Sequence, residues 1–165
     1  MLQIGLLSDT HGYLDDRIFH HFDTCDEIWH AGDVGSMDIL EQLESFRKVR
    51  AVYGNIDGHR IRAALPEIQR FTLEEVDVLI KHIGGYPGRY DPSVAGQIRE
   101  NPPRLFISGH SHILKVIPDK KYELLHINPG SAGKSGLHTI RTLVRFRLDK
   151  GQISELEVIE LGRMG

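Results

Sequence analysis

Cysteine is nearly absent from this chain of 165 residues, in which Cys25 is the single example. One thiol cannot form an intramolecular disulfide, and the N-terminus lacks the basic stretch and following apolar run that mark a signal peptide. No apolar run approaches the roughly 20 residues that span a bilayer. We therefore expect a cytoplasmic protein without a membrane partner.

An excess of positive charge is also absent. The chain has 20 Lys and Arg against 23 Asp and Glu, which gives a formal net charge of -3. This balance argues against an extended surface for nucleic acid, so any preference for phosphate has to be local. The length suits one sizeable core, and we expect a single domain over residues 1–165, with a homo-oligomer compatible with the sequence.

The first half of the chain alternates apolar runs with amphipathic segments. Residues 14–22 and 37–46 place their apolar side chains on one helical face, and Ser36 can cap the second of these helices. Strands are predicted between them, over residues 3–7, 28–30 and 49–53. This alternation is typical of an α/β sheet whose chemistry lies at the carboxyl ends of its strands.

The second half is largely β. A short helix is predicted over residues 93–101, where Pro102 and Pro103 end it. The predicted strands cover residues 68–73, 76–83, 105–107, 114–117, 122–127, 139–148 and 153–159. So many strands exceed one open sheet, and we predict an α/β (α+β) fold of two packed mixed β-sheets flanked by helices.

Histidine is abundant, with ten residues, and several of them follow predicted strands together with Asp or Asn. The strand-end side chains that can bind a metal ion are Asp9, His11, Asp33, Asn55, His82, His110 and His112. Residues two apart in an extended segment point to the same side, so Asp9 with His11, and His110 with His112, can each present a ligand pair.

Such a ligand set predicts two divalent ions. Ions about 3.5 to 4 Å apart repel each other and require a bridging anion, for which Asp33 is the best candidate. Imidazole, carboxylate and amide ligands suit transition metals better than calcium. We expect manganese first, with nickel, cobalt, zinc, iron or magnesium as the other candidates.

The order of these residues resembles the calcineurin-like metallophosphoesterase family, in particular its small bacterial and archaeal phosphodiesterase branch. The shared motifs are Asp9-Thr10-His11, Gly32-Asp33, Gly54-Asn55, His82, Gly109-His110-Ser111-His112 and Asn128-Pro129-Gly130-Ser131. They occur in order over nearly the whole chain, and so many motifs in register are highly specific. The resemblance implies two β-sheets sandwiched between helices.

The resemblance also implies a role for each residue. The first ion takes Asp9, His11 and His112, the second takes Asn55, His82 and His110, and Asp33 lies between the ions. A hydroxide bridging the ions attacks the phosphorus of a small phosphoester in line with the leaving group, so Asp33, Asn55 and His82 count as catalytic residues. The implied activity is that of a phosphodiesterase, with a phosphomonoesterase as the alternative.

Two positions depart from the family pattern. Many larger members have a proton-donating His after the Asn, where this chain has Ile56. Asp57 and His59 are the candidates for a general acid, although an Asp after a turn equally serves as a structural hydrogen-bonding residue. The second departure is Ile83, which follows His82 where the family has a glycine, so we expect a reshaped loop there.

Two other functions compete with hydrolysis at this site. The same fold serves as a non-catalytic, protein-binding scaffold in the retromer coat, but all seven ligand positions are filled here. Residues 128–135 nearly spell a phosphate-binding P-loop, although Asn128 stands where that motif requires Gly. A P-loop also opens a helix, whereas a strand is predicted soon after Lys134.

The remaining polar residues have structural interpretations by default. This applies to the other histidines, which are His20, His21, His30, His59, His126 and His138. Among them His30 is the candidate exception, because it lies near the Gly32-Asp33 loop. Tyr86, Arg89 and Tyr90 suit either surface packing or the rim of a substrate site. The alternating arginines of the strand over residues 139–148 can pair with Glu155 and Glu157, which predicts a solvated face. These arginines are Arg141, Arg145 and Arg147.

Overall fold

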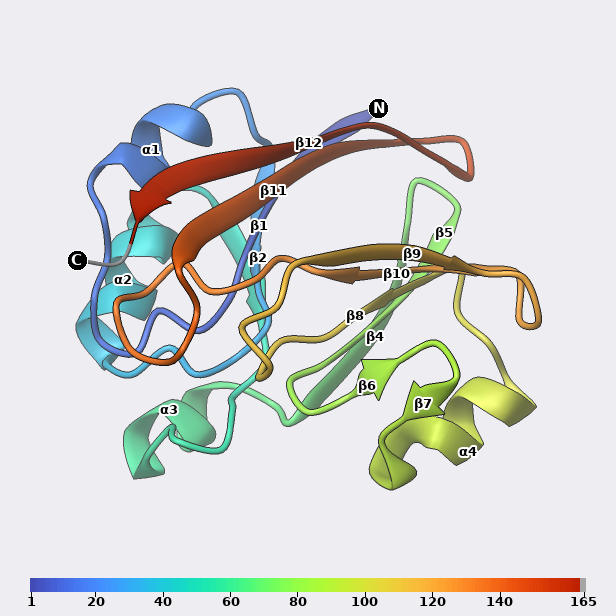
Figure 1. The fold of residues 1–165 in the computed structure, drawn as a ribbon. Helices are drawn as coiled ribbons and strands as arrows, with labels where there is room; N and C mark the ends of the chain where they lie inside the picture. Colours follow the sequence, from blue (N-terminus) through green and yellow to red (C-terminus); the bar gives the residue numbers. More distant parts are fainter. Residues whose placement is uncertain (164–165) are drawn as a thin grey trace.

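A computed structural model of the chain describes residues 1–163 and contains two five-stranded mixed sheets (Figure 1). The first sheet has the order β12-β11-β1-β2-β3. Its strands are β1 (Leu2–Leu7), β2 (Glu27–His30), β3 (Lys48–Ala51), β11 (Ile140–Asp149) and β12 (Gln152–Arg163). The first three run parallel, and β11 and β12 extend the sheet by antiparallel pairing.

The second sheet has the order β4-β5-β8-β10-β9. Its strands are β4 (Ile68–Leu73), β5 (Val76–Lys81), β8 (Leu105–Ile107), β9 (Lys115–Asp119) and β10 (Leu124–Asn128). The three central strands, β5, β8 and β10, are parallel, and an antiparallel strand closes each edge. A separate small hairpin, β6 (Gly85–Tyr86) with β7 (Arg89–Tyr90), follows β5.

Helices cover the outer face of each sheet, as Figure 1 shows. The helices are α1 (Arg17–His21), α2 (Met37–Phe46), α3 (His59–Ala64) and α4 (Pro92–Glu100). Buried side chains of α1, α2 and α3 join one apolar cluster with the first sheet, while Val94 and Ile98 of α4 pack on the second. None of the helices among the described residues has the length and hydropathy to cross a membrane.

The main core lies between the two sheets. Its buried side chains include Ile4 and Phe146 from the first sheet and Val78 and Ile107 from the second. Trp29 is fully buried and packs edge-on against Phe146, with ring centroids 5.6 Å apart. This arrangement confirms the predicted fold of two packed mixed sheets flanked by helices.

The structure corrects the sequence prediction at several elements. Residues 14–22 form a helix only over α1, because the chain before it turns at the loop that follows β1. Helix α3 and the β6-β7 hairpin were not predicted from the sequence. Ser36 does occupy the N-cap position of α2, but its side chain makes no capping hydrogen bond.

The predicted solvated arginine face is only partly present. Arg145 and Arg147 pair with Glu157 and Glu155 at 2.6 and 2.8 Å, as expected. Arg141 is instead buried, and its Nη1 lies 2.9 Å from a carboxylate oxygen of Asp15. The loop before α1 therefore pairs with β11, and Arg141 belongs to the interior rather than to a solvated face.

A glycine in the first strand tests how tightly the sheet packs on its helices. A Cβ on Gly5 would lie 2.7 Å from the ring of Phe22, which is fully buried. We expect Gly5→Ala to lower the free energy of unfolding by about 1 to 3 kcal/mol, because a filled core has no room for the methyl group. Urea unfolding in the presence of a chelator measures the change.

The matched control is Gly96→Ala in α4, where the nearest atom to a new Cβ is 3.6 Å away. Alanine favours the helix, so this variant should be more stable by about 0.4 to 1 kcal/mol. Equal stabilities of the Gly5→Ala variant and the wild type would show that the β1-Phe22 contact is looser than the structure has it.

Candidate metal centre

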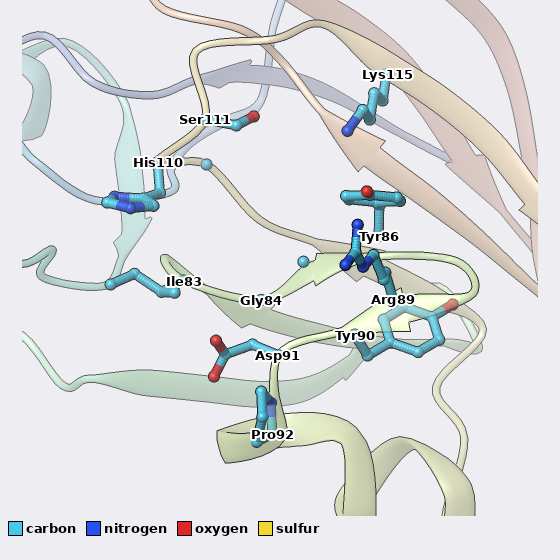
Figure 2. A pocket seen from close by; sticks show the side chains of 12 residues that line it. Ile83, Gly84, Tyr86, Arg89, Tyr90, Asp91, Pro92, His110, Ser111 and Lys115 are labelled. Atoms are coloured by element: carbon cyan, nitrogen blue, oxygen red, sulfur yellow. The ribbon is translucent and has the colours of Figure 1, made fainter.

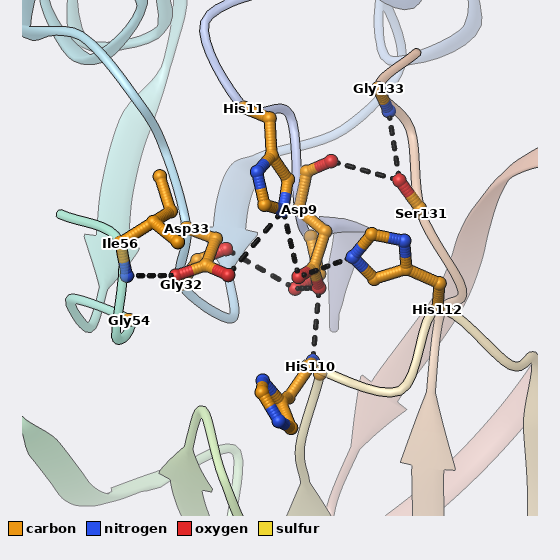
Figure 3. A network of polar contacts seen from close by, with 12 residues as sticks. Asp9, His11, Gly32, Asp33, Gly54, Ile56, His110, His112, Ser131 and Gly133 are labelled. Atoms are coloured by element: carbon orange, nitrogen blue, oxygen red, sulfur yellow. Dashed lines mark hydrogen bonds and ion pairs between the residues drawn. The ribbon is translucent and has the colours of Figure 1, made fainter. Parts of the chain in front are cut away.

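The loops that follow β1, β2, β5 and β8 meet at one end of the sandwich, where the two sheets face each other. Figure 3 shows Asp9 at the middle of this region, with the side chains of His11, Asp33 and His112 around it. Asp9 is fully buried, and Asp33 is 2% exposed. The structure thus brings both carboxylates to a shared interior site.

Six of the predicted ligands form two groups. Asp9, His11 and His112 make up the first cluster, whose nitrogen and oxygen ligand atoms lie within 4.8 Å of one another. The second cluster contains Asp33, His82 and His110 and satisfies the same distance limit. Each cluster combines residues from both sheets.

Each carboxylate is anchored through one oxygen and presents the other. Oδ2 of Asp9 accepts hydrogen bonds from the hydroxyl of Ser8 and the backbone N–H of His110, and Oδ1 faces Nε2 of His112 at 3.1 Å. Oδ1 of Asp33 accepts from the backbone N–H of Ile56 at 3.0 Å. In each case the protein fixes the orientation of the group and leaves one oxygen for the site.

The free oxygen of Asp33 connects the two clusters. Oδ2 of Asp33 lies 3.4 Å from Nε2 of His11 and 3.1 Å from Nε2 of His82. Asn55 joins the second cluster, because its Oδ1 lies 3.1 Å from Nε2 of His82 and 3.0 Å from Nδ1 of His110. All seven predicted ligands are therefore in one constellation.

Hydrogen bonds on the far side of two rings define which nitrogen faces the site. Nδ1 of His82 lies 2.7 Å from the carbonyl oxygen of Ala31, an acceptor, so that nitrogen carries the proton and Nε2 keeps its lone pair. Ile83 after His82 does not displace the ring from the cluster. The backbone N–H of Gly109 also donates to the carbonyl of His82, which fastens this loop to the next one.

His138 has the corresponding role for His112, although its place in the sequence predicts an ordinary structural histidine. Nε2 of His138 lies 2.8 Å from the carbonyl oxygen of Gly133, and its Nδ1 lies 3.1 Å from Nδ1 of His112. Because the carbonyl only accepts, Nδ1 of His138 is the acceptor for the N–H of His112. Nε2 of His112 is then the lone-pair nitrogen that faces Asp9.

The ligand residues do not lie in extended segments, as the pairing argument had assumed. Asp9, His11, Asp33, His110 and His112 have φ of 56°, 48°, 56°, 70° and 61°, in the left-handed region that side chains rarely adopt. The ligand pairs Asp9 with His11 and His110 with His112 do converge, but by this tight loop geometry instead. Clusters of such residues are characteristic of functional sites.

Hydrogen bonds between loops hold this unusual backbone in place. The backbone N–H groups of Asp9 and His11 donate to the carbonyls of Gly32 and Asp33, which ties the loop after β1 to the loop after β2. The hydroxyl of Ser131 donates to the carbonyl of Asp9 at 2.9 Å. The strain at each ligand is therefore opposed by several contacts.

The segment that resembles a P-loop braces these loops. The amide nitrogen of Asn128 donates to the carbonyl of Gly109 at 3.0 Å, and the backbone N–H of Ala132 donates to the carbonyl of Ser8. No helix follows it among the described residues, since β11 begins at Ile140. Lys134 stacks over the ring of Tyr13, 4.1 Å from its centroid, so the P-loop reading is wrong.

His30 lies beneath the site and supports it. Its Nδ1 accepts from the backbone N–H of Gly32 at 3.1 Å, so Nε2 carries the proton and donates to the hydroxyl of Thr10 at 3.0 Å. Complete burial lowers the pKa of His30 to about 4, which keeps the ring neutral. His30 therefore positions the Asp9-Thr10-His11 loop without reaching the ligand cluster.

The two candidates for a general acid lie outside the reacting region. The carboxylate of Asp57 is buried and accepts hydrogen bonds from the backbone N–H groups of Val34, Gly35 and Gly54 at 3.2, 2.9 and 2.8 Å. These three hydrogen bonds favour the structural interpretation of Asp57 over the general-acid role. His59 is exposed and shares a shallow hollow with residues of the α2 N-terminus rather than with the ligands.

The electrostatics of the site favour bound cations. Burial would raise the pKa of Asp9, but the imidazoles of His11 and His112 outweigh it and hold that pKa well below its usual range. Asp9 raises the pKa of His11 in return. Oδ1 of Asp9 and Nε2 of His11 are buried without a hydrogen bond, 3.5 Å apart. Two buried atoms of this kind without a hydrogen bond fit a metal ion, which would take the place of the proton that Asp9 favours on His11.

Comparison with known proteins agrees with this geometry. The profile of the "Calcineurin-like phosphoesterase superfamily domain" matches residues 2–151. A probable metallophosphoesterase of Methanothermobacter thermautotrophicus is 31% identical over an alignment of 166 residues. The alignment covers 96% of this chain and 92% of that protein.

Two solved structures share the fold. An archaeal phosphodiesterase has a TM-score of 0.75 at 22% identity, over 97% of this chain and 100% of the other. Wild-type Vps29 from Entamoeba histolytica, complexed with Zn²⁺, has a TM-score of 0.68 at 18% identity, over 96% of this chain and 99% of the other. With its motifs, its sandwich of two sheets and the sequence match over most of its length, the chain belongs to the calcineurin-like phosphoesterase superfamily.

Proposed function

We propose that this protein is a phosphodiesterase that hydrolyses small phosphodiesters at a centre of two divalent metal ions. The observation that carries the proposal is the position of Asp33, whose Oδ2 lies within 3.4 Å of one histidine from each ligand cluster. One carboxylate oxygen that faces both clusters is what a pair of adjacent cations requires. The archaeal phosphodiesterase of the same fold supports this choice of substrate class.

Each side chain then has a stated task. Asp9, His11 and His112 would hold the first ion, Asn55, His82 and His110 the second, and Asp33 both. Bound divalent ions would supply positive charge for the phosphate oxygens and would activate the attacking water. The carbonyl of Ala31 and Nδ1 of His138 keep Nε2 of His82 and Nε2 of His112 directed at the site.

The same arrangement makes the leaving group important. Ile56, the residue that follows Asn55, is 46% exposed and cannot donate a proton, and the carboxylate of Asp57 is occupied by three backbone N–H groups. We propose that the enzyme prefers diesters and accepts monoesters only with good leaving groups. Manganese is the proposed first metal, and a cytoplasmic location and a single domain over residues 1–165 complete the proposal.

The scaffold alternative rests on the likeness to Vps29, which at 18% identity shows the fold alone. Both ligand clusters are complete in this chain, and no contact among the described residues favours a protein-binding role for them over hydrolysis. A phosphomonoesterase is the nearer alternative, and the leaving-group experiment below separates it from a diesterase.

Removal of the shared carboxylate tests the two-ion centre. We expect chelator-treated protein to lose hydrolysis of bis(p-nitrophenyl) phosphate and to regain it with Mn²⁺, Ni²⁺, Co²⁺, Zn²⁺ or Mg²⁺. Asp33→Asn should lower the restored activity by about a hundredfold or more, since even residues behind metal ligands contribute 10- to 100-fold. Asp38→Asn, on the exposed face of α2, is the matched control and should keep full activity. Folded protein without turnover in any metal would overturn the proposal.

A series of leaving groups tests the absence of a general acid. For aryl phosphodiesters we expect kcat/KM to fall steeply as the pKa of the departing phenol rises, because nothing protonates the leaving oxygen. p-Nitrophenyl phosphate should be a weaker substrate than the diester, and glycerol phosphate should not react. His59→Ala should leave the slope unchanged, and a flat dependence in the wild type would contradict the proposal.

His138 provides a test of the first cluster. We expect His138→Ala to weaken the binding of one of the two ions by about 10- to 100-fold, because His112 loses the acceptor that fixes its tautomer. Isothermal titration of chelator-treated protein with Mn²⁺ measures both sites independently of activity. Affinities equal to those of the wild type would remove His138 from the metal centre, and His59→Ala is the histidine control.

A further inference from the structure

A pocket of about 450 Å³ opens beside the second ligand cluster. Figure 2 shows His110 and Ile83 at one side of it and Tyr86, Arg89 and Lys115 at the other. Its volume lies in the range of small-molecule sites. Because Gly109, His110 and Ser111 form part of its lining, anything bound at the second cluster has direct access to it.

The β6-β7 hairpin forms the far wall of this pocket and is fixed to the body of the protein. The hydroxyl of Tyr90 donates to Asp119 at 2.6 Å, and its ring packs edge-on against Phe106. The backbone N–H of Asp91 donates to the carbonyl of Gly84 at 2.9 Å. All three residues that suited either packing or a substrate rim line the pocket, and Tyr90 is in addition held by packing.

The charges of the pocket are unbalanced. Neither Arg89 nor Lys115 has a carboxylate within 4.0 Å among the described residues. The ammonium of Lys115 lies 3.6 Å from the ring centroid of Tyr86, which holds it at the pocket wall. Asp91 also lines the pocket, but its carboxylate caps α4 by accepting from the backbone N–H of Ser93 at 3.0 Å. Two cations thus face an opening that leads to the metal centre.

We infer that this pocket binds a second anionic group of the substrate, so that the preferred phosphodiesters carry a further phosphate on one of their ester substituents. This inference rests on the proposed function, because it places the scissile phosphate at the ligand clusters. A neutral substituent would leave both cations without an anionic partner, whereas a terminal phosphate accepts charge-assisted hydrogen bonds from a guanidinium or an ammonium group. A nucleotide unit has this composition, with a spacer between two phosphates.

Binding without turnover gives the first test. Chelator-treated protein is titrated with the dinucleotide TpT and with its two phosphorylated forms, pTpT and TpTp. At least one phosphorylated form should bind about tenfold more tightly than TpT, the effect expected of one added charge-assisted interaction. Arg89→Gln and Lys115→Gln should each remove most of this difference between the phosphorylated dinucleotide and TpT. Lys120→Gln, an exposed cation that lines a separate hollow, is the control and should retain the difference.

Hydrolysis by the Mn²⁺-loaded enzyme gives the second test. The substrates are the p-nitrophenyl esters of thymidine 5′-phosphate and of thymidine 3′-phosphate, each with and without a phosphate on its other hydroxyl, because p-nitrophenolate leaves without a general acid. At least one ester should show the higher kcat/KM when it carries the second phosphate, again through Arg89 and Lys115. No hydrolysis of any of these esters, with the difference in binding intact, would count against the proposed activity alone. Equal binding of all three dinucleotides by the wild type, or an equal loss of affinity in the Lys120→Gln control, would overturn the assignment of the pocket.

Discussion

Two carboxylates buried side by side, Asp9 and Asp33, set the constraint on which the rest of the site depends. Burying a negative charge is unfavourable unless it is paired and hydrogen-bonded, and two such charges in one place also repel each other. One oxygen of each carboxylate accepts hydrogen bonds from backbone N–H groups, and imidazole rings surround the other oxygen. The remaining lone pairs are available to cations. Bound metal ions would therefore relieve the repulsion between the two buried carboxylates and also supply the charge that the proposed hydrolysis requires.

The same constraint explains the left-handed backbone conformations around the site. Ligands from short loops can converge on one point only if the chain reverses sharply, and five ligand residues adopt left-handed conformations to do so. Asp, Asn and His tolerate this region better than most side chains, so the residue types that bind metals also suit the turns that present them. The neighbouring loops are the scaffold for this geometry, through Ser131, Asn128 and the buried carboxylate of Asp57.

The strand ends, and the polar side chains that meet there, could be predicted from the sequence because their signal is local. An apolar run that stops at Asp9 or Asp33 marks a buried strand that delivers a polar residue to the edge of a sheet, and the order of these motifs identified the family. The roles of Arg141 and His138 could not be predicted, because each depends on a partner distant in the chain. For Asp57 the sequence offered the structural hydrogen-bonding role as one alternative, but not the backbone groups of another loop that it binds. Helix α3 was not predicted, because it is only six residues long and gives little periodic signal. It contributes Arg62 to the loop after β3, where the guanidinium donates hydrogen bonds to the carbonyls of Asn55 and Asp57.

Each ligand cluster takes residues from both sheets: Asp9 and His11 leave the first sheet and His112 the second, while Asp33 leaves the first and His82 and His110 the second. An ion bound to either cluster would thus be a further cross-link between two layers that also contact each other through apolar packing and through hydrogen bonds between their loops. Its binding free energy adds to the cohesion of the sandwich, since the unfolded chain has no such site. Metal occupancy and the contact between the sheets would therefore be thermodynamically linked, and loss of bound metal would loosen the molecule at the end that carries the two clusters.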